Sequence, residues 1–216
     1  MVRAVKKTQT YTRIVDAGLA LFNELGERNV STNHIAQHLG ISPGNLYYHF
    51  ANKEEIIVQI FKRYSSELLA YLTDTELPAS VKEAVGYLGG VYDIMWKYRF
   101  LFNDINSLML RSAEFLVEHN QFTGERVSPL LIELLTRMQN AGILEIDDTG
   151  KHDLSVNMWL VTKYWFDFDR SMIGQGSYGS DIIPRGIRRT LSLVRPYLKE
   201  PHLQEFDEMM HGIPVL

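Results

Sequence analysis

The chain has 216 residues, of which 45% are apolar and 22% are charged, proportions typical of a folded protein with one domain or a small domain fused to a larger one. It contains no cysteine, which excludes disulfides, thiolate metal ligands and cysteine nucleophiles. No apolar run approaches the ~20 residues of a membrane span. No signal-peptide core follows the basic N-terminus, so we expect a cytoplasmic protein.

The net charge of −4 is unevenly distributed. Residues 1–63 contain 8 Lys and Arg against 5 Asp and Glu, whereas residues 64–216 contain 14 against 21. A small basic end therefore precedes a larger acidic body. If the protein binds nucleic acid, the first 63 residues are the expected place.

The first quarter of the chain predicts four helices, over residues 10–25, 32–39, 43–50 and 53–71. Ser31 is a good N-cap for the second helix. Ser42 followed by Pro43 is an N-cap with the favoured first helical residue. Asn52 and Glu55 have the spacing of a capping box before the fourth helix.

Helical periodicity continues to the end of the chain. We expect helices over 80–97, 102–120, 129–141, 152–172, 182–195 and 201–210. They are separated by breaks at 73–79 and Gly124, a polar loop at 145–151 and a glycine-rich loop at 174–179. No segment alternates apolar and polar residues long enough to indicate a sheet, so the predicted fold class is all-α.

Residues 31–57, STNHIAQHLGISPGNLYYHFANKEEII, predict a helix-turn-helix unit. Its inward-facing residues are Ile35, Ala36, Leu39, Ile41, Leu46 and Phe50. The other face of the second helix carries Asn45, Tyr47, Tyr48 and His49, which offer donors, acceptors and planar rings without an acidic group. Such a face suits the major groove of DNA.

The pattern IA..LGIS.GNLYYHF.NKEEI resembles the DNA-binding domain of the tetracycline-repressor (TetR) family over residues 10–60. The resemblance implies an N-terminal helix-turn-helix three-helix domain in residues 1–60. It also implies a helical C-terminal domain for effector binding and dimerisation in residues 61–216. Beyond residue 60 the resemblance is weak.

The resemblance also assigns roles to residues in and around the predicted helix-turn-helix. Bases or the adjoining backbone would be contacted by Pro43, Gly44, Asn45, Tyr48 and His49. Phosphates would be contacted by Ser31, Thr32, Tyr47 and Lys53, with Arg3, Lys6 and Lys7 near the flanking backbone. Simpler readings stay open: Tyr47 as a packing residue, and Tyr48 and His49 as plain surface.

His34 and His38 are four residues apart on one helix, a spacing that can hold a metal. No acidic third ligand is nearby, so we predict no metal site there.

A ligand pocket is predicted in the second domain, where residues 92–110 are rich in aromatics and Met. The expected lining residues are Tyr92, Trp96, Phe100, Phe102, Met109 and Met138, with Leu131, Leu134 and Leu135 as another wall. Arg99 or Arg111 could anchor a carboxylate. The effector is expected to be apolar or amphipathic, such as a fatty acyl compound, a lipid or an aromatic. The alternative is an ordinary helical core.

The helices at 152–172 and 182–195 carry more large apolar residues than one buried stripe needs. We therefore expect them to form a homodimer interface.

The segment GQGSYG at 174–179 matches a dinucleotide fingerprint literally, but no strand precedes it, so it is interpreted as a loop. No catalytic constellation is visible, and we expect neither an enzyme nor a cofactor. The predicted function is repression of transcription from double-stranded operator DNA, relieved by the effector. The alternative is an activator or a nucleoid-associated protein.

Overall fold

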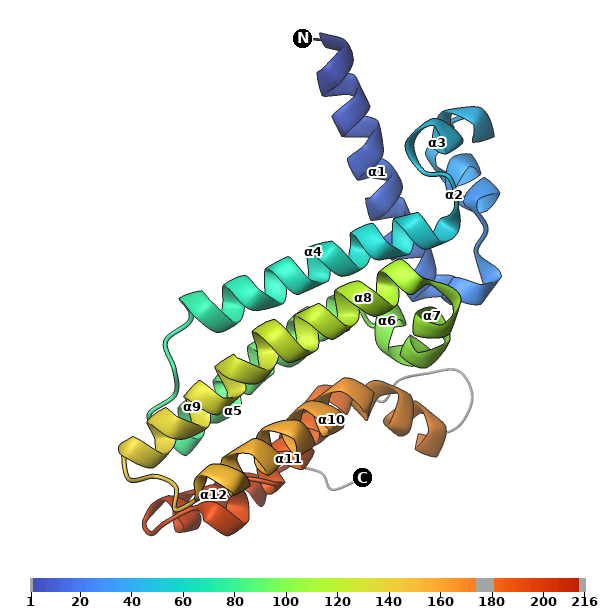
Figure 1. Cartoon of the computed structure of the whole chain (residues 1–216). Helices are drawn as coiled ribbons and strands as arrows, with labels where there is room; N and C mark the ends of the chain where they lie inside the picture. Colours follow the sequence, from blue (N-terminus) through green and yellow to red (C-terminus); the bar gives the residue numbers. More distant parts are fainter. Residues whose placement is uncertain (1, 174–180, 214–216) are drawn as a thin grey trace. The chain divides into compact units, whose positions relative to one another are not determined.

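The computed structural model describes residues 2–173 and 181–213 (Figure 1). Within those residues the chain is helical, and its one β-type pairing is an isolated bridge between Leu144 and Leu198. The all-α fold class expected from periodicity is therefore confirmed. None of the described helices is long and apolar enough to cross a membrane.

The chain divides into two compact units. The N-terminal unit consists of Met1–Ser66 and Tyr98–His119, and the C-terminal unit consists of Glu67–Lys97 and Asn120–Leu216. This division differs from a single boundary near residue 60, because a second segment of the chain returns to the N-terminal unit. Helix α4 (Lys53–Asp74) contributes residues to both units.

The N-terminal unit contains the predicted helix-turn-helix. It begins with α1 (Val2–Leu25) and the 3-10 turn η1 (Glu27–Asn29). Helices α2 (Thr32–Leu39) and α3 (Pro43–His49) follow, and α4 begins at Lys53 (Figure 1). These starts match the capping signals in the sequence, because the side chains of Ser31, Ser42 and Asn52 each accept a backbone N–H three residues on.

The returning segment of the N-terminal unit is broken where one helix was expected over 102–120. It forms α6 (Phe100–Asn103), α7 (Ile105–Arg111) and α8 (Ala113–Gln121). Ser112 ends α7 in an extended conformation, and its hydroxyl accepts the N–H of Phe115 in α8. The helical pattern concealed this break because a serine inside a helix and a serine cap look alike in sequence.

Aromatic side chains of the returning segment complete the core of the N-terminal unit. Phe100 lies 5.1 Å from Phe22 of α1, between ring centroids. Phe102 lies 5.3 Å from Tyr64, and Phe115 lies 4.9 Å from Phe61, both partners being on α4. The helix-turn-helix therefore packs on a core whose residues come from two distant parts of the sequence.

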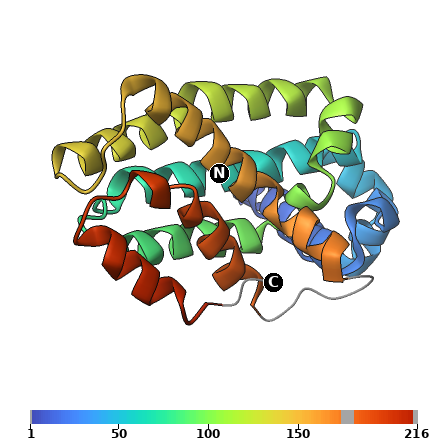
Figure 2. The same cartoon turned by 90° about the horizontal axis from the view of Figure 1, so that it is seen from below.

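The C-terminal unit contains α5 (Val81–Lys97), α9 (Ser128–Asn140), α10 (Asp148–Ile173), α11 (Ile182–Ser192) and α12 (His202–Met210), with the 3-10 turn η3 (Arg195–Tyr197) after α11. Helix α11 packs against α5 and α10, and α10 packs against α9 (Figure 2).

Two expected breaks in this unit are helical. The break expected at Gly124 lies in η2 (Phe122–Val127), a π-helix that joins α8 to α9. The loop expected at 145–151 is shorter, because Asp147 accepts the N–H of Gly150 at 2.7 Å and α10 begins at Asp148. The glycine-rich segment 174–179 lies outside the described residues.

Candidate nucleic-acid interface and ligand cavity

The turn between α2 and α3 is held by hydrogen bonds at both of its ends. The Ser31 hydroxyl accepts the N–H of His34, and Nδ1 of His34 accepts the N–H of Ser31, which makes a reciprocal capping box. Gly40 ends α2 with a φ of 65°, and the N–H of Ile41 donates to the carbonyl of Ala36 at 3.0 Å. His34 is therefore engaged in starting α2.

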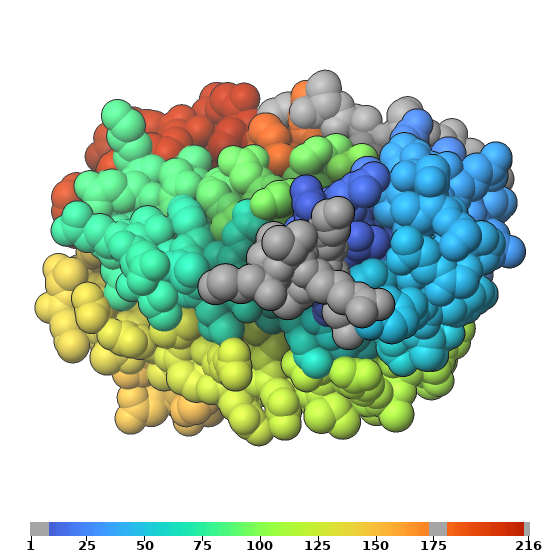
Figure 3. Space-filling model, turned by 90° about the horizontal axis from the view of Figure 1, so that it is seen from above, coloured from blue at the N-terminus to red at the C-terminus, as the bar shows by residue number. Residues whose placement is uncertain are grey.

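Helix α3 is anchored on one side and open on the other. Leu46 is fully buried and Phe50, directly after the helix, is almost so. Tyr48 is 68% exposed and Tyr47 is 51% exposed. Pro43, Gly44 and Asn45 are exposed at the start of α3, and His49 is half-buried. Residues of α2 and α3 form a continuous light-blue part of the surface in Figure 3.

Gly44 has no neighbour in the direction in which a side chain would point. A Cβ added there would meet no atom within 4 Å. Packing inside the protein thus does not require a glycine at this position. The bare backbone is available for close approach by a partner.

The four residues assigned to phosphates lie together. Ser31, Thr32, Tyr47 and Lys53 line one shallow surface pocket, which also includes Arg28, Asn52 and Glu54. The hydroxyls of Thr32 and Tyr47 are 3.1 Å apart, so Tyr47 links α3 to α2 while its ring stays exposed. The N-termini of α2 and α4 both reach this pocket, and helix N-termini favour anions.

Lys53 is not a free cation in this arrangement. Its Nζ lies 2.7 Å from Oε1 of Glu27 and donates to the Glu27 carbonyl at 3.0 Å, and its side chain is only 18% exposed. Arg111 of α7 bonds the other Glu27 oxygen at 2.8 Å. Burial alone would raise the pKa of Glu27, but the hydrogen bonds from Lys53 and Arg111 leave the pKa below its ordinary value.

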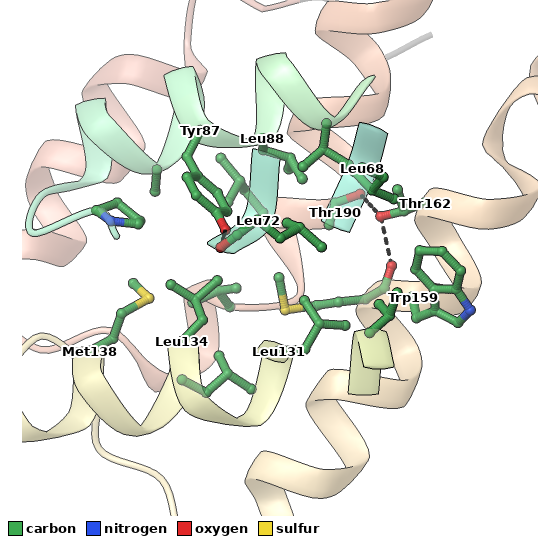
Figure 4. A pocket seen from close by; sticks show the side chains of 18 residues that line it. Leu68, Leu72, Tyr87, Leu88, Leu131, Leu134, Met138, Trp159, Thr162 and Thr190 are labelled. Carbon is green, nitrogen blue, oxygen red and sulfur yellow. Dashed lines mark hydrogen bonds between the residues drawn. The ribbon is translucent and has the colours of Figure 1, made fainter. Parts of the chain in front are cut away.

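The C-terminal unit encloses an apolar cavity (Figure 4). Its free volume, counted as the space that the centre of a water molecule can occupy, is about 70 Å³. Since one water needs roughly 10–15 Å³ by this measure, a ligand larger than a few waters requires the lining to adjust. The lining comes from α4, α5, α9, α10 and α11 and includes Leu68, Leu72, Tyr87, Leu131, Leu134, Met138, Trp159, Thr162 and Thr190.

The hydroxyls around the cavity are already hydrogen-bonded. Thr162 donates to the Met158 carbonyl at 2.8 Å and lies 3.2 Å from Thr190. Thr190 in turn lies 3.0 Å from the Tyr92 hydroxyl. Because no charged side chain lines the cavity, its chemistry suits an apolar group.

Of the six expected pocket residues, only Met138 lines this cavity. Tyr92 is fully buried beside it and bonded to Thr190, and the Trp96 ring lies 5.5 Å from Phe166. Phe100 and Phe102 belong to the core of the N-terminal unit, as described above, and Met109 is half-buried on α7 in the same unit. The amino-acid composition identified a segment rich in aromatic residues, but it did not show on which side of its helix each ring packs.

The cations suggested as carboxylate anchors also lie elsewhere. Arg111 pairs with Glu27, and Arg99 donates to the Asn23 carbonyl at 3.4 Å, both within the N-terminal unit. The cavity's walls on α9, namely Leu131, Leu134 and Leu135, are those expected from the sequence. Its α4 wall of Leu68 and Leu72 was not expected, although both belong to the apolar face of that helix.

Helix α10 presents large apolar side chains that none of the other described residues covers. Val156, Leu160, Phe168 and Met172 are exposed, and they follow a spacing of four residues or multiples of it. We call them the α10 ridge. The apolar residues of α11 behave differently: Ile182, Ile187 and Leu191 are buried in the C-terminal unit.

The chain matches two family models that together span most of its length. The model described as "Bacterial regulatory proteins, tetR family" matches residues 14–60. The model described as "Bacterial transcriptional repressor" matches residues 63–206.

Individual relatives agree with these models. The crystal structure of a TetR-family transcriptional regulator from Marinobacter aquaeolei is 33% identical, covers 94% of this chain and 97% of its own, and has a TM-score of 0.81. The transcriptional repressor KstR2 of Rhodococcus jostii is 24% identical over 91% of this chain and 94% of its own length. The fatty acid metabolism regulator protein of Bacillus subtilis is 29% identical over 36% of this chain, and the match spans only 41% of that relative's length.

Proposed function

The chain belongs to the TetR family of bacterial transcriptional regulators, and we propose that it binds operator DNA as a homodimer and represses transcription until an effector releases it. Helix α3 is the proposed reading helix. The effector is an apolar or amphipathic small molecule that occupies the cavity of the C-terminal unit.

The observation that carries the DNA-binding proposal is the chemistry of the open face of α3. Asn45, Tyr47 and Tyr48 are exposed there with no acidic residue among them. Hydroxyl and amide groups can read base edges in the major groove. The pocket of Ser31, Thr32 and Tyr47 beside it offers hydroxyls and helix N-termini to a phosphate.

The proposed control by an effector rests on α4. This helix begins beside the phosphate pocket with Lys53 and supplies Leu68 and Leu72 to the cavity lining. A ligand that enlarges the cavity must displace part of that lining. Movement of α4 would then change the position of α3. In a dimer, the two α3 helices must stay about 34–36 Å apart to enter successive major grooves.

The experiment that tests DNA binding is fluorescence anisotropy with duplex DNA from upstream of the protein's own gene, a random duplex and a salt series. We expect preferential binding that weakens as salt rises. Tyr48→Ala should lower the preference for operator about 5- to 150-fold, equivalent to about 1–3 kcal/mol. Leu110→Ala, at an exposed leucine of α7, is the matched control and should change nothing.

The outcomes separate the proposal from its rivals. Failure to bind either duplex at low salt contradicts the function. Equal binding to both duplexes at all salt concentrations indicates a nucleoid-associated protein. An effector that strengthens operator binding indicates corepression.

A further inference from the structure

A second hollow of the C-terminal unit is a surface groove between η2 and α10. Thr123 of η2 and Ser128 of α9 line one side, and Val156, Trp159, Leu160 and Lys163 of α10 line the other. Unlike the cavity, this groove contains a charged side chain.

Lys163 is largely buried and forms no ion pair with any of the described residues. The residue is 7% exposed, its ammonium still reaches solvent, and the ammonium lies 4.9 Å from the ring centroid of the neighbouring Tyr164. Burial lowers the pKa of Lys163. An ammonium at the edge of a largely buried side chain favours an anionic partner, because water screens its charge less there than on an open surface.

Two further groups at the groove lack partners. The Thr123 hydroxyl and the Trp159 indole N–H are buried and make no hydrogen bond with the described residues. Each can donate, as can the Lys163 ammonium. Buried polar groups are nearly always satisfied, so two buried, unsatisfied donors beside an ammonium on one groove indicate an acceptor that the described residues do not supply.

The backbone around Thr123 is also unusual. Residues Phe122–Val127 form a π-helix, a rare conformation that occurs frequently at functional sites. The π-helix contributes both Thr123 and Gly124 to the groove. This observation is independent of the missing hydrogen bonds.

Trp159 connects the groove to the apolar cavity, because it lines both hollows. Figure 4 shows its indole nitrogen on the side of the ring that faces away from the labelled cavity side chains. Leu131 lines both hollows as well. A single ligand could therefore place a polar end in the groove and an apolar end in the cavity after a modest movement of the Trp159 ring.

We propose that the groove binds the carboxylate of an amphipathic effector through Lys163, Thr123 and Trp159, while the effector's apolar tail occupies the cavity. This inference rests on the proposed function, since it specifies the chemistry of the effector. It assigns the role of carboxylate anchor to Lys163. Val156 and Leu160 also belong to the α10 ridge, so dimerisation would shield the ion pair from water.

The test compares octanoate with octanol, which share a tail and differ in the carboxylate, by calorimetric titration of the full-length protein. We expect octanoate to bind about 10- to 100-fold more tightly, the range for a charge-assisted hydrogen-bonded contact. Lys163→Met should remove this difference and leave octanol binding unchanged. Lys163→Arg should retain it. Lys82→Met, at an exposed lysine of α5, is the matched control.

Two further variants probe the uncharged donors. Thr123→Val and Trp159→Phe keep the size and the ring, respectively, and each removes one donor. Thr123→Val should weaken octanoate binding several-fold, in keeping with one lost hydrogen bond, without weakening octanol binding. Trp159→Phe also alters a wall of the cavity, so it should weaken octanoate binding more than octanol binding. Equal losses for both ligands would mean that these residues only shape the tail site, which contradicts the proposal.

The remaining results separate this inference from the proposed function. Equal affinities in the wild type, no binding of either ligand, or a preference that survives in Lys163→Met would overturn the inference. Loss of the dimer in Lys163→Met with unchanged octanoate binding would overturn it too, since a second subunit would then occupy the groove. If octanoate binds as expected but never releases operator DNA, the inference holds and the effector part of the proposed function fails.

Discussion

At position 44, protein stability and DNA binding favour different residues. Alanine has a higher helix propensity than glycine, and beyond the local helix backbone no atom of the described residues would lie within 4 Å of the added methyl group. We therefore expect Gly44→Ala to leave the melting temperature unchanged or raised. The same methyl group should reduce operator affinity about 10-fold or more, because it prevents close approach of the backbone to DNA.

The two effects of Gly44→Ala are measured on the same preparation by thermal unfolding and by anisotropy. A loss of both stability and operator binding would contradict the assignment, because it would show that the methyl group disturbs the fold. Undiminished operator binding would show that α3 does not approach the DNA at its first turn.

Glu27 predicts how acid affects stability. Its pKa is lower in the folded protein than the ordinary value of 4.5, so the ionised carboxylate stabilises the fold. This stabilisation is complete above the ordinary pKa and is lost as the pH falls through the lower folded value. Glu27→Gln should lower the free energy of unfolding by about 1.5–3 kcal/mol at pH 7, the range for hydrogen bonds to a charged group. It should also make the free energy of unfolding fall less steeply as the pH decreases.

The measurement is the free energy of unfolding in urea between pH 7 and pH 3. Glu133→Gln is the control, because Glu133 forms an exposed pair with Arg137 on α9 and such pairs are worth about 0–1 kcal/mol. Equal losses for the two variants would show that the contacts of Glu27 with Lys53 and Arg111 are not a special source of stability. The same contacts limit Lys53, which can reach a phosphate only by leaving or sharing Glu27.

At the scale of the element, the α10 ridge is an apolar surface that the described part of the chain leaves uncovered. Exposed apolar side chains spaced by four residues form a row that packs well into the groove of another helix. Since α11 buries its apolar residues in the C-terminal unit, we now expect α10 to provide most of the dimer contact. The earlier expectation shared that role between the two helices.

Phe168→Glu tests this expectation away from the proposed carboxylate groove. A charge placed in an apolar interface should weaken dimerisation at least 10-fold, since burial of an unpaired carboxylate is unfavourable. Sedimentation velocity across a concentration series measures the change. Leu110→Glu, at a leucine that is 89% exposed on α7, should remain dimeric, and a dimer unaffected by Phe168→Glu would place the interface elsewhere.

At the scale of the whole molecule, effector and operator should oppose each other to the same degree. If effector weakens operator binding by a given factor, operator must weaken effector binding by that factor, because the two binding equilibria are linked. We expect a factor of about 5–150, the usual range for such coupling. Titrations of effector with and without saturating operator, and the reverse pair, measure it. A factor of one would separate the cavity from control of DNA binding.

The helix-turn-helix was predictable because the sequence signals that begin and end its helices are local. Ser31, Ser42 and Asn52 cap the helices that follow them, and Gly40 closes α2 in a left-handed conformation. Each cap depends on atoms within a few residues of itself. The sequence therefore sufficed for the all-α class, the helix-turn-helix and the open face of α3, and the motif carried the family resemblance.

Only the tertiary structure decided where the aromatic residues of the middle of the chain belong. Phe100 and Phe102 were expected around a ligand, yet they pack on Phe22 and Tyr64 in the N-terminal unit. Lys53 was expected to contact a phosphate, and the structure pairs it with Glu27, which is 26 residues away in sequence. The sequence did not single out Lys163, because the absence of an ion-pair partner depends on which residues pack around it in the tertiary structure. Helical periodicity reports that a residue is apolar and on which side of its helix it lies, but the neighbour that covers that side is set by packing between segments far apart in the chain.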